Sequence, residues 1–281
     1  MNRLLITSLA CVVFSGCGGA DFAFYHPDSK VYGTPARDGL AYEDLRFPSG
    51  DGTMLSGWFI PSATPAKGTV VHFHGNAQNM TSHYSFVSWV PRNGFNLFLF
   101  DYRGYGDSDG KPSRKGVHQD CLAAIKYVQG RDEVDASKII VFGQSLGGAN
   151  AIAVVGGEKL DGIVGLVSDS AFSSYEEVGK DHVAGSLKPL AGSLITDSYS
   201  PIEVVGRISP IPLIIMHGSE DQVVPYHHAE RLYGAAKAPR ELWTFHGGKH
   251  TDALGVRRRE TVSRLLKCFR LWTATAMMND E

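Results

Sequence analysis

Short apolar runs alternate with helical stretches along most of this 281-residue chain, and this alternation constrains the fold most. The predicted strands are Thr69–Phe73, Leu97–Phe100, Lys138–Phe142, Gly162–Val167, Pro212–Met216 and Glu241–Phe245. The predicted helices are Tyr84–Asn93, Gly116–Gln129, Leu146–Val155, His227–Ala236 and Arg257–Thr273. Apolar strands that alternate with helices predict a mostly parallel sheet covered by helices on both faces.

Two further segments complete the predicted domain, which spans residues 41–281. Tyr42–Pro48 and Met54–Pro61 are joined by a turn that contains Asp-Gly, so we expect a hairpin that adds an antiparallel edge to the sheet. The strand–helix rhythm breaks between Phe172 and Pro210, where glycines and prolines recur. We interpret residues 172–210 as a small cap over the site, with a plain surface excursion as the alternative.

The N-terminus is typical of an export signal. Arg3 precedes an eleven-residue apolar run, Leu4–Phe14, which is too short to span a bilayer but suits the core of a signal peptide. The following Ser-Gly-Cys17-Gly resembles the lipobox of bacterial lipoproteins, whose cysteine carries lipid. We expect residues 1–16 to be a signal peptide, Cys17 to be lipidated and residues 17–40 to form a tether. A buried first helix is the alternative.

This resemblance carries a prediction of location. The chain would be exported and held to the bacterial cell envelope through Cys17, so a membrane is an expected partner. Gly18 resembles the outer-membrane sorting pattern of Gram-negative bacteria, which favours the outer membrane, facing the periplasm. The net charge of −2 gives no basic surplus, so we expect no nucleic-acid partner.

Ser145 is the predicted nucleophile. It lies in Gly143-Gln144-Ser145-Leu146-Gly147, between a predicted strand and a predicted helix, which is the context of a G-x-S-x-G nucleophile elbow. A sharp strand-to-helix turn exposes the hydroxyl, and the helix N-terminus offers free N–H groups to a developing oxyanion. The alternative is a glycine-rich turn whose serine only caps a helix.

A serine hydroxyl needs a base to take its proton and an acid to orient that base. His250 and His246 both follow the last predicted strand. His250 lies on a flexible loop that can reach the site, and we favour it because Gly-x-His after the last strand is the usual arrangement in folds with this nucleophile turn. The acid should follow the preceding strand, where the sequence predicts Asp221, with Glu220 beside it as a substitute. Asp169 is a further possibility, one strand earlier, although a structural role suits it better.

The oxyanion hole is expected to use two backbone N–H donors, one from Leu146 and one from Asn76 in the loop after Thr69–Phe73. His72 lies within that strand and His74 begins the loop, but no carboxylate or third histidine follows at ligand spacing, so we predict no metal there. The segment Asp101–Ser108 is interpreted as a structural turn, or else as a wall of the pocket.

These motifs together resemble the α/β-hydrolase superfamily over about residues 40–275. The motifs are His74-Gly75-Asn76-Ala77, Asp101-Tyr102-Arg103-Gly104-Tyr105-Gly106, Gly143–Gly148 and His217-Gly218-Ser219-Glu220-Asp221. They are similar to the branch with protein depalmitoylases, lysophospholipases and many uncharacterised bacterial hydrolases. The resemblance implies cleavage of acyl esters or thioesters without a cofactor. It also implies that Cys121 and Cys268 lie on opposite faces of the sheet, too far apart to bond.

The sequence thus predicts a lipid-anchored serine hydrolase that acts on a small-molecule or lipid acyl ester through an acyl-enzyme. Two alternatives stay open. A peptidase or an acyltransferase would use the same triad on another bond, and a binding lipoprotein would keep the fold without catalysis.

Overall fold

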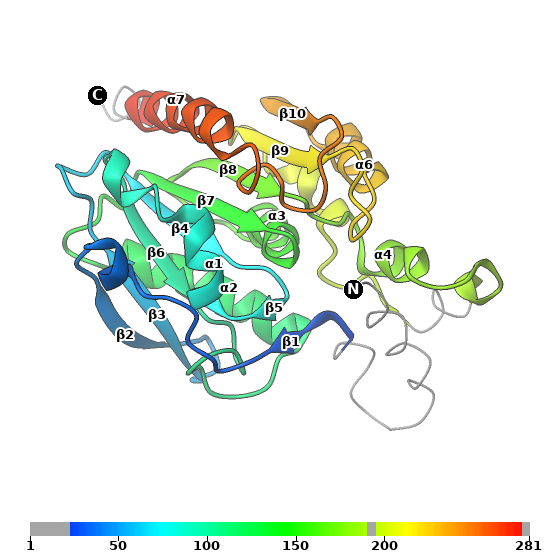
Figure 1. The fold of residues 1–281 in the computed structure, drawn as a ribbon, viewed down its shortest axis with the longest axis horizontal. Helices are drawn as coiled ribbons and strands as arrows, with labels where there is room; N and C mark the ends of the chain where they lie inside the picture. Colours follow the sequence, from blue (N-terminus) through cyan, green and yellow to red (C-terminus); the bar gives the residue numbers. More distant parts are fainter. Residues whose placement is uncertain (1–22, 190–194, 277–281) are drawn as a thin grey trace.

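A central eight-stranded sheet organises the computed structural model, which describes residues 23–189 and 195–276 (Figure 1). Its strand order is β10-β9-β8-β7-β4-β6-β3-β2. β3 pairs antiparallel with both β2 and β6, and every other pair in this sheet is parallel, so β3 alone runs opposite to the other strands. The sheet is therefore mostly parallel, as the alternating pattern predicts. The strands are β2 (Glu43–Pro48), β3 (Met54–Ile60), β4 (Thr69–Phe73), β6 (Asn96–Phe100), β7 (Ile139–Gln144), β8 (Ile163–Asp169), β9 (Leu213–Gly218) and β10 (Arg240–Phe245).

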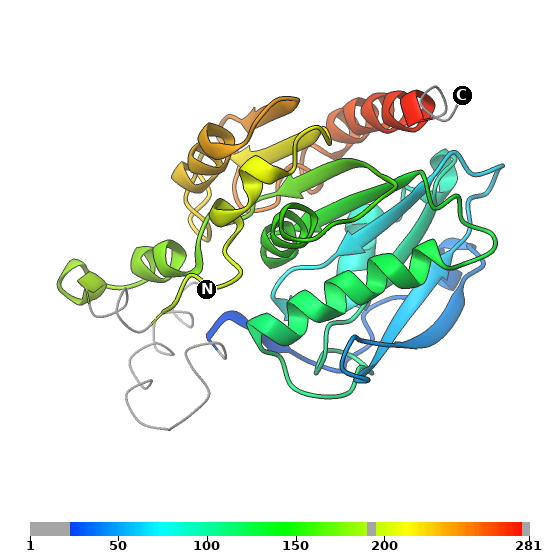
Figure 2. The same ribbon diagram turned by 180° about the vertical axis from the view of Figure 1, so that it is seen from behind.

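Helices cover both faces of this sheet, because each buries an apolar stripe against it. One face carries α1 (Met80–Val87) and α7 (Arg258–Ala276), which are in front in Figure 1. The other carries α2 (Arg114–Gln129), α3 (Leu146–Gly157) and α6 (His227–Ala235), and Figure 2 looks onto it. Cys121 belongs to the core of the second face and Cys268 packs against that of the first, and both thiols are free.

The predicted helix Tyr84–Asn93 is wrong in its boundaries. The helix begins four residues earlier, at Met80, because the side chain of Asn79 accepts the N–H of Thr81 and caps it. It ends at Val87, and a separate 3₁₀ turn follows at Pro91–Asn93, where proline suits the first position of a new turn. The predicted strands agree with the structure within one or two residues at each end.

The segment before the sheet is held against the loop that follows β4. Its residues His26–Pro27 form β1, which pairs in parallel with β5 (Ala77–Gln78), and a 3₁₀ turn follows at Pro35–Asp38. The expected signal peptide, Cys17 and the first part of the tether lie outside the described residues. None of the helices in 23–189 and 195–276 is both long and apolar enough to cross a bilayer.

The stretch expected as a cap contains α4 (Tyr175–Asp181) and 3₁₀ turns at Gly185–Leu187, Pro201–Glu203 and Val205–Arg207. Figure 1 shows α4 and β1 at the end of the molecule toward which the parallel strands run. Phe24 meets Tyr175 of α4 edge to face, with ring centroids 5.0 Å apart. The N-terminal segment therefore packs against this helix beside the carboxyl ends of the strands.

Candidate active site

The turn from β7 into α3 forces Ser145 into an unusual backbone conformation. Its φ is 54° and its ψ is −118°, a combination that is costly for any residue with a side chain. The turn closes only because glycines flank it. A Cβ on Gly147 would lie 2.0 Å from the carbonyl oxygen of Phe73, and one on Gly143 would lie 2.2 Å from the carbonyl oxygen of Gly147. The predicted elbow geometry is therefore present at Ser145.

The structure brings Ser145, His250 and Asp221 into one chain of contacts. His250, in the loop after β10, places its Nε2 atom 3.0 Å from Ser145 Oγ. Its Nδ1 atom lies 2.7 Å from Oδ2 of Asp221, in the loop after β9. The alternative residues His246 and Glu220 are exposed and do not take these places.

The carboxyl group of Asp221 is held in its ionised form. Its Oδ1 atom accepts the N–H groups of Val223 (2.8 Å) and Val224 (2.9 Å). Burial by itself would raise the pKa of Asp221, but hydrogen bonds from His217, His250 and Val224 outweigh it and hold that pKa well below its usual range. A fixed carboxylate of this kind keeps the imidazole of His250 in one orientation.

Asp169, the other candidate acid, lies at the end of β8 with its side chain fully buried. Its backbone carbonyl accepts the N–H of Ser145 at 2.7 Å, and its Oδ1 atom accepts the hydroxyl of Ser170 at 3.1 Å. Burial raises the pKa of Asp169 to about 6. Nδ1 of His250 contacts Asp221, so Asp169 does not orient the imidazole. Asp169 instead supports the turn at Ser145 through its backbone carbonyl.

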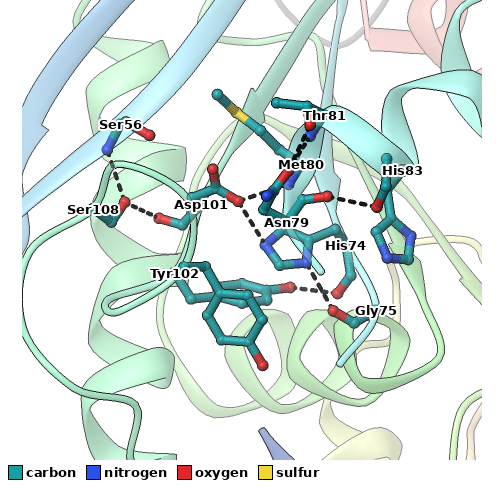
Figure 3. Close-up of polar contacts among 12 residues, drawn as sticks. Ser56, His74, Gly75, Asn79, Met80, Thr81, His83, Asp101, Tyr102 and Ser108 are labelled. Atoms are coloured by element: carbon teal, nitrogen blue, oxygen red, sulfur yellow. Dashed lines mark hydrogen bonds and ion pairs between the residues drawn. The ribbon is translucent and has the colours of Figure 1, made fainter. Parts of the chain in front are cut away.

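The loop after β4 passes beside the nucleophile. A Cβ on Gly75 would lie 3.7 Å from Cβ of Ser145. Nδ1 of His74 donates to the carbonyl of Gly75 at 2.7 Å (Figure 3). In a trans peptide the N–H points opposite to the C=O, so this bond turns the N–H of Asn76 to the other side of that peptide.

Two tyrosines fix the neighbouring carbonyls of the same loop. The Tyr102 hydroxyl donates to the carbonyl of His74 at 2.8 Å, and the Tyr105 hydroxyl donates to that of Asn76 at 2.7 Å. The turn after β6 is thus structural, and it acts on the loop beside Ser145. Its sequence alone did not reveal this, because the contacts join segments almost thirty residues apart.

Asp101 supports His74 from the side away from the loop. Nε2 of His74 lies 3.3 Å from Oδ1 of Asp101, and that oxygen also accepts the N–H of Met80 at 2.6 Å (Figure 3). The hydroxyl of Ser108 donates to the Asp101 carbonyl at 2.7 Å. The side chains of His74 and Asp101 are both buried, so this pair is part of the core under the loop.

His83 is a neighbour of the site that sequence reasoning missed. Its Nδ1 atom lies 2.9 Å from Oε1 of Gln144, the residue before the nucleophile, and its Nε2 atom lies 3.2 Å from the carbonyl of Ala77. Burial lowers the pKa of His83 to about 4, so the ring is neutral at pH 7. It links the elbow to the loop after β4, and no motif in the sequence marks it.

Asp181, His227 and His228 are the residues close enough to share a metal ion in the part of the chain that the structure describes. Oδ2 of Asp181 lies 2.7 Å from Nε2 of His227 and 3.1 Å from Nε2 of His228. However, Nδ1 of His228 accepts the N–H of Ser173, so the neutral ring carries its proton on Nε2, directed at the carboxylate. The group therefore acts as a clamp between α4 and α6.

His72, the other histidine considered as a ligand, lies inside the sheet and packs edge-on against Phe142. Burial lowers its pKa well below the usual range, which keeps it neutral.

A mostly parallel sheet with one reversed strand, a serine at a strained strand-to-helix turn and a histidine after the last strand together define an α/β hydrolase. The comparisons agree. A family model described as "Serine aminopeptidase, S33" matches residues 64–199, which include Ser145 but end before Asp221 and His250. An uncharacterized protein of Escherichia coli O157:H7, YfhR, is 44% identical over 238 residues, which cover 83% of this chain and 81% of the relative.

One further relative and one solved structure extend the comparison. The α/β hydrolase domain-containing protein WAV2 of Arabidopsis thaliana is 34% identical over 241 residues, covering 80% of this chain and 77% of WAV2. A solved esterase of Pyrococcus furiosus has the same fold, with a TM-score of 0.75 at 21% identity, covering 89% of this chain and 98% of that one. The chain belongs to the α/β-hydrolase family.

Proposed function

We propose that this hydrolase cleaves carboxylic esters or thioesters through an acyl-enzyme on Ser145. The observation that carries the proposal is the continuous contact from Ser145 Oγ through His250 to Asp221, at 3.0 Å and 2.7 Å. Each distance is within the reach that proton transfer and imidazole orientation require.

In the first half of the reaction, Oγ of Ser145 attacks the acyl carbonyl carbon while Nε2 of His250 takes the hydroxyl proton. The tetrahedral intermediate then collapses, and His250 returns that proton to the leaving alcohol or thiol. Asp221 stabilises the imidazolium that forms in between without taking its proton. An acyl group remains on Ser145.

In the second half, His250 takes a proton from water, which attacks the acyl carbonyl carbon. The bond to Ser145 Oγ then breaks, His250 returns the proton to that oxygen, and the carboxylic acid leaves. In both halves the oxyanion would be bound by the backbone N–H groups of Leu146, at the start of α3, and Asn76. The Leu146 assignment is supported by the first N–H groups of a helix having no partner within it. The Asn76 assignment is supported by the orientation of its peptide.

Labelling with a fluorophosphonate probe tests this proposal. We expect the probe to label the wild type but neither Ser145→Ala nor His250→Ala. His246→Ala is the matched control, because His246 follows the same strand and is exposed, and it should label like the wild type. A folded wild type that does not label would support a non-catalytic binding protein instead.

The second candidate function is that of a peptidase, which the match to the serine aminopeptidase family model favours. An acyltransferase would pass the acyl group to an alcohol or amine instead of water. A panel of p-nitrophenyl esters, thioesters and aminoacyl amides separates these activities, and we expect hydrolysis of the esters and thioesters. Faster cleavage of the amides would show that the enzyme is a peptidase and that the proposed ester substrates are wrong.

We also propose that the protein is exported and carries lipid on Cys17. The support is the sequence around that residue. Mass spectrometry of the protein from its membrane fraction tests it, since a lipidated N-terminal cysteine adds the mass of its acyl chains.

A further inference from the structure

Most of the exposed large apolar side chains lie at one end of the molecule. Among the described residues they are Val31, Leu187, Val223, Val256 and Leu271. Leu187, Val223 and Val256 lie in the connections that follow β8, β9 and β10, and Val31 lies in the N-terminal segment beside the start of α1, which follows β4. The carboxyl ends of these parallel strands are at the end of the molecule where Ser145 lies. Single exposed apolar side chains are common on protein surfaces, so the end that these four share, and not their number, indicates a common partner.

The topology places each of these four residues. Val31 lies beside the start of α1, where its neighbours Lys30 and Tyr32 are hydrogen-bonded to Asn79 and Thr81. Leu187 ends the 3₁₀ turn beyond α4, which projects at this end in Figure 1.

The other two lie in the loops that carry the triad. Val223 is in the loop of Asp221, and Val256 is in the loop between His250 and α7. Val256 is 84% exposed. Leu271, in contrast, lies on the last turns of α7, toward the opposite end.

Exposed basic residues accompany three of these side chains in the sequence. Lys30 precedes Val31, Lys188 follows Leu187 and Arg257 follows Val256. Apolar side chains flanked by lysine or arginine are typical of surfaces that lie on anionic lipid bilayers, where the apolar group enters the headgroup region and the cation meets phosphate.

The expected lipid anchor would emerge at the same end. Tyr25 is buried, its hydroxyl lies 3.3 Å from that of Tyr175 in α4, and Ala23 is the first described residue. Ala23 follows Cys17 by six residues, so a lipid on Cys17 would lie within about 20 Å of Ala23. A tether this short keeps the carboxyl end of the sheet next to the bilayer.

We propose that the surface formed by Val31, Leu187, Val223 and Val256 docks on an anionic lipid bilayer, so that the site at Ser145 receives acyl esters of membrane lipids. Docking follows from the apolar and basic side chains and from the tether. The substrate class also rests on the proposed function. A bilayer-facing site suits long acyl chains, because such esters are held in the membrane and have little access to a site that faces water.

Orientation on the membrane is the first test. The exported full chain, with Cys268→Ser to remove the half-buried thiol, receives a fluorophore at Val256→Cys or at Leu271→Cys. The protein is added to vesicles of phosphatidylcholine and phosphatidylglycerol that contain brominated lipid, which quenches nearby fluorophores. We expect strong quenching at position 256 and little at position 271. Equal quenching at both positions, or no quenching at either, would overturn the proposal.

Catalysis on vesicles is the second test. The double variant Leu187→Asp with Val256→Asp should hydrolyse a lipid ester in the same vesicles at least about tenfold more slowly, because charge at these positions opposes entry into the headgroup region. Leu271→Asp is the matched control, because Leu271 is also an exposed leucine (65%) but lies at the other end of the molecule. This variant should hydrolyse the lipid ester at the wild-type rate. Equal rates for the two variants would contradict the docking surface.

A soluble ester separates the docking surface from the chemistry. All these variants should hydrolyse p-nitrophenyl acetate like the wild type, because none of the substituted residues contacts the triad. Normal hydrolysis without vesicle docking would overturn this inference and leave the proposed function standing. Docking with no hydrolysis of any ester would reverse that outcome, because the surface would stand and the proposed function would fall.

Discussion

The backbone N–H of His26 donates to the carbonyl oxygen of Asn76 at 2.9 Å. The N-terminal segment is therefore hydrogen-bonded to the loop that we assign to the oxyanion hole. The same carbonyl accepts the Tyr105 hydroxyl at 2.7 Å, so two donors from separate parts of the chain hold one peptide in place. Order in the N-terminal segment and order in the site are coupled through this atom.

A substitution that removes this N–H should lower activity. Proline at position 26 has no donor, and a hydrogen bond of this kind contributes about 1 kcal/mol. We expect His26→Pro to lower kcat by about fivefold with little change in KM, because the affected loop serves the transition state. His26→Ala keeps the N–H and is the matched control. Equal kcat values for the two variants on a soluble ester would show that the bond is irrelevant to catalysis.

That Ser145, His250 and Asp221 contact one another was predictable from sequence because the signals are local. Ser145 lies in a motif between a strand and a helix that both have clear apolar patterns, and chain order then directs attention to the loops of Asp221 and His250. Choosing Asp221 over Asp169 already depended on the family pattern. In the structure the choice depends on the reach of the His250 loop, which no local pattern encodes.

The supports of the site were not predictable in the same way. Asp101 and Tyr102 act on the loop after β4 through contacts between segments that are distant in the sequence. His83 lies on a helix whose start we placed four residues too late, because the capping role of Asn79 competes with a plain loop assignment. The motif that contains Asp101 and Tyr102 does not say what they contact, and His83 lies in no motif, because the roles of all three depend on tertiary packing.

Replacing the triad carboxylate should reduce catalysis strongly while the fold persists. Asp221→Asn keeps an acceptor for Val223 and Val224 but loses the charge that faces Nδ1 of His250. We expect kcat to fall by about 10³- to 10⁴-fold, as for loss of this role in other triads. Glu220→Gln is the matched control because Glu220 is adjacent and exposed, and its kcat on the same ester should match the wild type. A larger loss for Glu220→Gln would reassign the acid.

The glycine at the elbow should be intolerant of any side chain. Alanine at position 147 would bring a Cβ against the carbonyl of Phe73, which is backbone and cannot turn aside. We expect Gly147→Ala to lower the free energy of unfolding by at least about 3 kcal/mol and to abolish probe labelling. Gly234→Ala in α6 is the matched helical control, because a Cβ there meets nothing within 4 Å. It should stabilise the protein by about 0.5–1 kcal/mol in urea unfolding.

Asp169 should make stability depend on pH in a direction opposite to that of a salt-bridged acid. Burial raises its folded pKa to about 6, whereas an unfolded aspartate has a pKa of about 3.9. Below about pH 4 both states are protonated and the group has no effect. Between these pKa values only the unfolded state loses its proton, so stability falls as pH rises, and above about pH 6 the cost stays constant at roughly 3 kcal/mol.

The variant Asp169→Asn isolates this effect, because asparagine does not ionise and still accepts the Ser170 hydroxyl. Asp169→Asn should have a larger free energy of unfolding than the wild type. This gain in stability should be about 2 kcal/mol larger at pH 7.5 than at pH 4.5. Urea unfolding at the two pH values measures the difference, with the exposed Asp132→Asn as the control that should show none. If the difference at Asp169 is also absent, its carboxyl group is not desolvated, and its place beneath the elbow must be one that water reaches.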